Sequence, residues 1–122
     1  MLSLDDPLLN YSLMIYIASA LTRKGGDSTK NSLLSPIYTP SFLLKKFPPT
    51  KILVAEVDPL RDNGIYLGLN LKRAGVDTEL YYFKEYIHNF LQFDDVTFGI
   101  PEYQNAHEIT ISAFKQLLQF HE

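Results

Sequence analysis

The sequence predicts an α/β fold with parallel strands and flanking helices, in which the sheet is incomplete. Residues 51–57 (KILVAEV) form a short apolar, β-branched run, and residues 78–83 (TELYYF) form a second one. Residues 62–74 between them have helical spacing, so the unit is a strand–helix–strand crossover, which makes the two strands parallel. Because a sheet averages about five or six strands, two strands indicate one edge of a larger α/β domain.

The N-terminal third is predicted to be a helix followed by a linker. Residues 1–22 are apolar around most of the helix circumference, so this helix is expected to be buried. Asp5 or Asp6 can cap it, and Pro7 fits the first helical position, where no N–H partner is needed. Residues 23–34 are polar and rich in Gly, Ser and Lys, and we expect a flexible linker there.

The remaining elements follow from proline, glycine and apolar spacing. Four prolines in residues 35–49 leave room for one short helical turn around residues 41–46. The helix over residues 62–74 is expected to end with Gly75 at its C′ position. A last helix is expected from Glu102 or Asn105 to about residue 120. We treat residues 1–122 as a single segment.

The composition excludes several classes of protein. Eleven Lys and Arg against 14 Asp and Glu give a net charge of -3, which argues against a nucleic-acid binder. There is no Cys, so disulfides and thiolate metal sites are excluded. The apolar stretch over residues 8–21 is shorter than the roughly 20 residues of a bilayer span. Its acidic flank is unlike that of a secretory signal. We expect a cytoplasmic protein without a cofactor or a metal.

Asp58 and His88 are the candidate site residues. Asp58 ends the first strand and His88 follows the second, and the carboxyl ends of parallel strands meet at one edge of a sheet, where reactive groups gather. An acid beside a histidine can orient the ring and stabilise the imidazolium. Spacing alone also allows structural roles: Asp58 and Pro59 favour a turn, and a histidine beside aromatic residues is often a packing residue.

The motif order around these residues resembles a known family. An apolar strand, D-P-L-x-D, a helix ending in A-G, a second strand and H-G-F form the C-terminal signature of the hormone-sensitive lipase family of α/β-hydrolases. The counterparts here are residues 58–62 (DPLRD), residues 74–75 (AG) and residues 88–90 (HNF). Residues 5–9 (DDPLL), 34–36 (LSP) and 47–49 (FPP) are similar to the same family.

The resemblance implies the C-terminal part of an α/β-hydrolase catalytic domain that cleaves carboxylic esters, such as lipids and acylglycerols. By it, Asp58 is the acid of a Ser-His-Asp triad and His88 is the general base. Asp62 is expected to cap the following helix rather than to take part in catalysis. Asn89 stands where the family has Gly, and Asn is the residue with a side chain that best tolerates the left-handed region.

The nucleophile is missing from these 122 residues. The family's G-x-S-x-G elbow and H-G-G oxyanion loop precede the acid, and neither sequence occurs here. Residues 26–30 (GDSTK) begin like an elbow, but Lys30 replaces the last Gly and no strand precedes them. We therefore expect Ser28 to belong to the linker and the segment alone to be inactive, the nucleophile coming from an upstream segment. His107 and His121 are expected on the solvated surface.

The expected partners follow from the same resemblance. In the intact parent protein the substrate would be an acyl ester or an acylglycerol, with a lipid-droplet surface as a place of action. An exposed sheet edge also favours a homo-oligomer, because unpaired strands associate. The alternative function is a non-catalytic α/β interaction or oligomerisation module. A peptidase of the same fold is a third candidate, since fold does not determine substrate.

Overall fold

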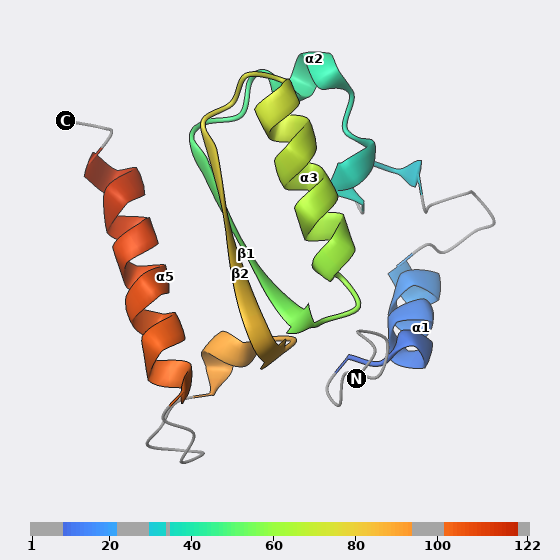
Figure 1. The fold of residues 1–122 in the computed structure, drawn as a ribbon. Coiled ribbons are helices and arrows are strands. Elements are labelled where there is room, and N and C mark those ends of the chain that lie inside the picture. The colour runs from blue at the N-terminus through green and yellow to red at the C-terminus, as the bar shows by residue number, and fades with distance from the viewer. Residues whose placement is uncertain (1–8, 22–29, 34, 94–101, 120–122) are drawn as a thin grey trace.

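Helices and strands alternate along the chain in the predicted order. The computed structural model describes residues 9–21, 30–33, 35–93 and 102–119. The elements in this part of the chain are α1 (Tyr11–Leu21), η3 (Pro36–Tyr38), α2 (Ser41–Leu44), β1 (Thr50–Val57), α3 (Arg61–Arg73), β2 (Thr78–Ile87), η4 (Phe90–Gln92) and α5 (Glu102–Gln119) (Figure 1). The predicted linker over residues 23–34 lies largely outside the described residues.

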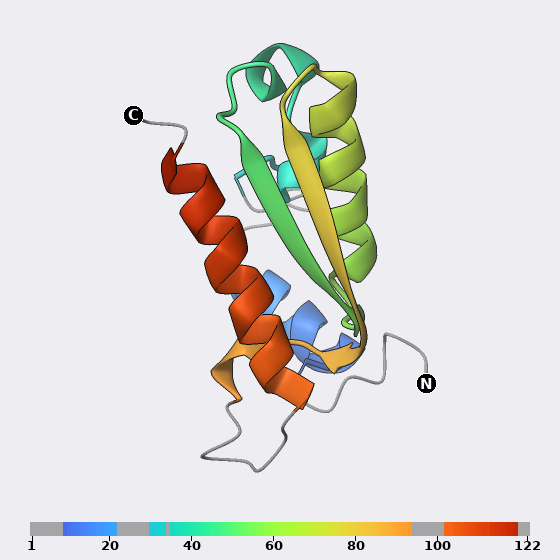
Figure 2. The same cartoon turned by 60° about the vertical axis from the view of Figure 1, so that its left-hand side comes forward.

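The two strands form a parallel, two-stranded sheet in the described part of the chain, which confirms the predicted fold class. The helix α3 makes the crossover and covers one face of the sheet, while α5 lies against the other face (Figure 2). The sheet is therefore the middle of three layers, because a helix covers each of its faces. Both strands run toward the same end of the molecule, so the residues after Val57 and Ile87 emerge at one edge.

Close approach of α3 to the sheet depends on two glycines. A Cβ atom on Gly64 would lie 2.7 Å from Val54 Cγ1, and one on Gly68 would lie 3.3 Å from side-chain atoms of Ile52 and of Leu80. A side chain at either position would push the helix outward.

The helix α3 begins at Arg61 and ends as predicted, because Gly75 adopts a positive φ of 85°. The amide of Gly75 then donates to the carbonyl of Lys72, and that of Val76 to the carbonyl of Leu71, as in a Schellman cap.

The opposite face holds a second core. Ala55, Phe83, Phe90 and Ala106 are buried there together, with Ile109 of α5 packed against them. The small alanine of α5 lets the helix approach the aromatic rings of β2 and of the segment after it. The last helix therefore supports the same strand ends at which Asp58 and His88 lie.

The first helix differs from its prediction. It begins at Tyr11, because Asn10 Oδ1 accepts the N–H of Leu13 at 3.0 Å and caps the first turn. Asp5, Asp6 and Pro7 lie outside the described residues. Among the side chains that the structure describes on this helix, the expected burial is not seen at three apolar positions: Tyr16 is 71% exposed, and Leu13 and Ile17 are also exposed. No helix in the described ranges is both long enough and apolar enough to cross a membrane.

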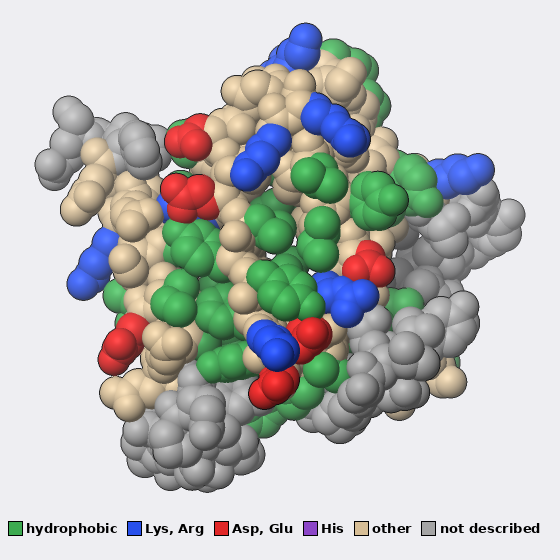
Figure 3. Space-filling view, in the orientation of Figure 1, with side chains coloured by type: hydrophobic (Ala, Val, Ile, Leu, Met, Phe, Trp, Pro, Cys, Tyr) green, Lys and Arg blue, Asp and Glu red, His purple; other side chains and the backbone are tan. Residues whose placement is uncertain are grey.

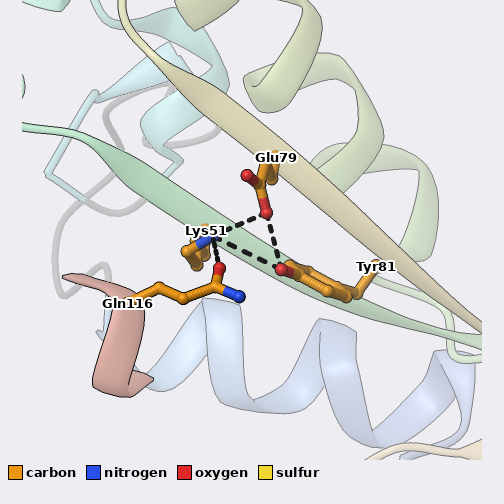
Figure 4. A network of polar contacts seen from close by, with 4 residues as sticks. All are labelled: Lys51, Glu79, Tyr81 and Gln116. Atoms are coloured by element: carbon orange, nitrogen blue, oxygen red, sulfur yellow. Dashed lines mark hydrogen bonds and ion pairs between the residues drawn. The ribbon is translucent and has the colours of Figure 1, made fainter. Parts of the chain in front are cut away.

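A polar network fastens α5 to the sheet at the edge opposite the site (Figure 4). Lys51 Nζ donates to Glu79 Oε2 at 2.6 Å, to Gln116 Oε1 at 2.7 Å and to the Tyr81 hydroxyl oxygen at 3.3 Å. The Lys51 side chain is only 6% exposed, although that of Glu79 is 53% exposed. The hydrogen bond from the Lys51 ammonium holds the pKa of Glu79 below its ordinary value of 4.5.

This network predicts an acid-dependent contribution to stability. Because the pKa of Glu79 is lowered in the folded state, its stabilising effect is complete above pH 4.5 and is lost as the pH falls through the lowered value. Glu79→Gln is expected to reduce the free energy of unfolding at neutral pH, and the deficit should vanish in acid. Denaturant unfolding over a pH series measures this. In a Lys51→Met background the same substitution should have a smaller effect, because only the Tyr81 hydroxyl then donates to Glu79, at 2.6 Å. A deficit that persists in strong acid would contradict the assignment.

Candidate functional site

Asp58 occupies the turn that connects β1 to α3. Its Oδ1 atom accepts the N–H of Leu60 at 2.7 Å, and its backbone carbonyl accepts the N–H of Arg61 at 3.0 Å. Pro59 has no N–H and its fixed φ suits the second position of such a turn. One carboxylate oxygen therefore locks the turn, which fixes the direction of the other oxygen. The structural role that spacing alone allowed is real, and it coexists with the contact to His88.

His88 follows β2 directly, because the strand extends to Ile87 rather than ending at Phe83 as predicted. The register explains the extension. From Thr50↔Thr78 to Ala55↔Phe83 the partners differ by 28 positions (78 − 50), but at Val57↔Ile87 they differ by 30 (87 − 57). Two additional residues of β2 are therefore accommodated between these pairs, and the last pair carries the chain directly into His88.

The two side chains meet at the shared strand edge. His88 Nδ1 lies 2.9 Å from Asp58 Oδ2, as the sequence predicted. An ionised Asp58 carboxylate could only accept, and this contact would then select the Nδ1–H tautomer of a neutral imidazole. The side chains are 14% exposed for Asp58 and 23% exposed for His88. Partial burial strengthens the interaction, because an electrostatic hydrogen bond is stronger where the local dielectric is low.

An aromatic cluster holds the His88 turn in place. The ring centroids of Phe83 and Phe90 are 4.8 Å apart, and those of Tyr86 and Phe90 are 5.1 Å apart in an edge-to-face arrangement. Tyr86 precedes the histidine and Phe90 follows it, so the turn is anchored on both sides. Asn89 lies between them with φ 58° and ψ 23°, the left-handed conformation expected where the family has Gly.

Two polar residues near the site differ from their predictions. Asp62 makes no cap; Arg61 Nε donates to Asp62 Oδ1 at 2.8 Å, and the aspartate lies in the first turn of α3. Instead, Asp58 accepts the N–H of Leu60 in the turn that precedes α3. His107 is half-buried rather than solvated, and its Nε2 lies 2.9 Å from the carbonyl oxygen of Leu91. This contact ties α5 to the segment after His88.

Glu56 and Glu85 are residues that the sequence interpretation missed. Glu56 Oε2 accepts the N–H of Glu85 at 2.8 Å, beside the register shift, and Glu85 has a positive φ of 67°. The sequence did contain one indication of a role for Glu56: it is an acidic residue within the apolar run over residues 51–57. Ser28 and His121 lie outside the described residues. Within the described ranges, no three His, Asp or Glu side chains gather as metal ligands would.

The geometry defines an acid–base pair at the carboxyl edge of a parallel sheet with helices on both faces, which is the place where α/β enzymes hold reactive groups. Comparison with known proteins gives the class. Residues 2–92 match the family described as alpha/beta hydrolase fold, so the chain is an α/β-hydrolase.

Curated relatives narrow the class to one family. An esterase of Gibberella moniliformis is 33% identical over 87 residues, which are 70% of this chain and 27% of the esterase. Human hormone-sensitive lipase is 32% identical over 62 residues, which are 51% of this chain and 6% of the lipase.

Solved structures agree with the curated relatives. Carboxyl esterase 2 of the fungus Tuber melanosporum superposes with a TM-score of 0.78 at 29% identity, over 93% of this chain and 36% of that one. Brefeldin A esterase, a bacterial homologue of human hormone-sensitive lipase, gives 0.60 at 27% identity, over 73% of this chain and 24% of the esterase. The chain belongs to the hormone-sensitive lipase family of α/β-hydrolases and spans about a third or less of each of these relatives.

The left-handed turn at Asn89 makes a testable prediction. Asn89→Gly is expected to preserve stability, because Gly adopts this conformation without a steric penalty. Asn89→Val is expected to lower the free energy of unfolding by about 1–2 kcal/mol, since a β-branched side chain crowds the left-handed backbone. Urea unfolding measures both variants. Equal stability of the valine and glycine variants would show that the turn does not require a positive φ.

Proposed function

We propose that this chain contributes the acid and the base of a serine ester hydrolase of the hormone-sensitive lipase type. The observation that carries the proposal is the 2.9 Å contact between Asp58 Oδ2 and His88 Nδ1. Membership of a family that includes esterases and lipases supports the reaction class. The proposed substrates are carboxylic esters, including acylglycerols.

In the proposed mechanism each ring nitrogen of His88 has its own task. The Nδ1–H donates to Asp58, which fixes the tautomer and makes Nε2 the basic atom. As a serine hydroxyl attacks the ester carbonyl, Nε2 takes the hydroxyl proton and the carboxylate stabilises the resulting imidazolium. The imidazolium then returns the proton to the leaving alkoxide oxygen, which departs as the alcohol. A water molecule repeats the sequence to release the acid from the acyl-enzyme.

The serine and the oxyanion donors are proposed to come from sequence beyond these 122 residues. No G-x-S-x-G or H-G-G sequence occurs in the chain, and relatives matched here are about three or more times longer than the matched region. The isolated 122-residue chain is therefore expected to lack esterase activity. Measurable hydrolysis of a short-chain chromogenic ester that is abolished by Ser28→Ala would contradict this part of the proposal.

A chimera tests the catalytic roles directly. Residues 35–119 replace the corresponding segment of the Tuber melanosporum esterase, which retains its own nucleophile. Turnover of a chromogenic ester is expected. Asp58→Asn should lower kcat by roughly 10⁴, because the base loses its tautomer, and His88→Gln should lower it by roughly 10⁶, because the serine loses its base.

Asp62→Asn provides the matched control in the same chimera. It removes a carboxylate four residues from Asp58 that contacts Arg61 rather than His88. Its kcat should stay within a few-fold of the parent chimera. If Asp62→Asn lowered kcat as much as Asp58→Asn does, the assignment of Asp58 as the acid would be wrong. Full activity of the His88 variant would overturn the proposed mechanism.

Self-association through the β2 edge is a second candidate function, favoured by one observation. Hydrophobic side chains gather over this edge and the neighbouring side of α3 (Figure 3). Exposed hydrophobic residues of these two elements include Leu80 and Tyr82 on β2 and Tyr66 and Leu69 on α3. An unpaired strand edge beside an apolar patch favours pairing with a second copy of the chain.

The proposed self-association can be measured by sedimentation. The unmodified chain is expected to sediment as a discrete dimer, and Tyr82→Lys should shift it to a monomer, since a charge within the patch opposes its burial. Phe114→Lys, on the exposed side of α5, is the matched control and should leave the dimer intact. A monomer at all concentrations would remove this candidate.

A further inference from the structure

The contact between Asp58 and His88 depends on the register shift near the end of the sheet. With the offset of 28 that holds from Thr50 to Ala55, residue 86 would stand opposite Asp58 (58 + 28). With the offset of 30 that holds at Val57, residue 88 stands there (58 + 30). The bulge in β2 therefore decides whether a tyrosine or the histidine faces the acid.

The bulge requires a conformation that its sequence does not favour. Glu85 has a φ of 67°, and a residue with a side chain is disfavoured in the left-handed region. Bulges that use this conformation normally place Gly there. The residues inserted into β2 also lose their regular ladder partners, so a backbone amide in the bulge needs another acceptor.

Glu56 supplies that acceptor. Its Oε2 atom receives the N–H of Glu85 at 2.8 Å, and Glu56 is the one residue of β1 between the pairs Ala55↔Phe83 and Val57↔Ile87. A hydrogen bond to a carboxylate is stronger than one to a neutral oxygen. The carboxylate therefore stabilises the left-handed residue at the position where the register changes.

Glu56 is itself held by the turn that carries the acid. Its backbone carbonyl accepts from Arg61 Nη1 at 3.0 Å, and Arg61 lies at the start of α3, directly after the Asp58 turn. One residue thus connects the Asp58 turn, through its carbonyl, with the bulge that precedes His88, through its carboxylate.

We propose that Glu56 is a positioning residue for the base: its carboxylate holds the bulge at Glu85 and thereby places His88 Nδ1 against Asp58. The inference deepens the proposed function and rests on it only for the catalytic meaning of the pair. Glu56 acts through the backbone and needs no contact with a substrate.

The test observes the His88 ring in the 122-residue chain and needs neither a nucleophile nor a substrate. Nitrogen-15 NMR of the imidazole at a pH where the ring is neutral reports which nitrogen carries the proton. The Nδ1–H form should dominate in the unmodified chain and fall in Asp58→Asn, which sets the reference for a lost contact. In Glu56→Ala the fraction of the Nδ1–H form should fall to the same level as in Asp58→Asn. Glu56→Gln should retain the Nδ1–H form, because its amide oxygen still accepts the Glu85 N–H.

Two further variants separate positioning from general damage. Glu79→Ala removes a carboxylate from the far end of the same sheet, where it pairs with Lys51, and should leave the His88 tautomer unchanged. Glu56→Ala combined with Glu85→Gly should regain much of the Nδ1–H form, because Gly adopts the left-handed conformation without the carboxylate.

Amide hydrogen exchange keeps the proposal testable if Glu56→Ala does not fold. In the unmodified chain the Glu85 amide should exchange at least about tenfold more slowly than an unprotected amide, as expected for a hydrogen bond to a charged acceptor. Exchange at the unprotected rate would overturn the proposal, as would a folded Glu56→Ala variant that keeps the Nδ1–H form. A different result would count against the proposed function alone. In it, the unsubstituted chimera shows no esterase activity, while the His88 tautomers of the 122-residue variants follow the pattern expected here.

Discussion

The structure around the candidate site depends on one constraint, the parallel pairing of β1 with β2 up to Val57 and Ile87. Asp58 is fixed by its own turn, in which one carboxylate oxygen binds the N–H of Leu60. His88 is fixed by the turn that Tyr86 and Phe90 anchor in the aromatic cluster. Neither turn alone specifies the contact between them. The last pair of the sheet brings the two turns together at a distance that a hydrogen bond can span.

Both faces of the sheet help to maintain this pairing. On one face, Gly64 and Gly68 let α3 lie directly on β1 and β2. On the other face, Ala106 of α5 packs beneath Phe83 and Phe90. Asp58 and His88 therefore belong to a unit that includes the last helix, and His107 adds a polar contact from this helix to the carbonyl of Leu91.

The sequence was sufficient for features that local chemistry determines. Apolar β-branched runs located both strands, Gly75 located the end of α3, and the order of the D-P-L-x-D and H-N-F motifs located the pair Asp58 and His88. Asn89 was expected to tolerate a left-handed turn, and it adopts one.

Features that depend on tertiary contacts were beyond the sequence interpretation. The strand β2 was predicted to end at Phe83, before Lys84 and Glu85, but it runs to Ile87. It continues because the Glu56 carboxylate binds the Glu85 amide across the sheet. Likewise, local propensity placed a cap at Asp62, but Asp58 makes the hydrogen bond before α3 because Pro59 fixes the turn there.

A crystal structure of the chain that resolves individual side-chain atoms is the most direct test of the site. We expect His88 Nδ1 to lie within hydrogen-bonding distance of Asp58 Oδ2, near 2.9 Å, with Val57 paired to Ile87. Side chains that are separated beyond hydrogen-bonding distance, with residue 86 opposite Asp58, would contradict the account.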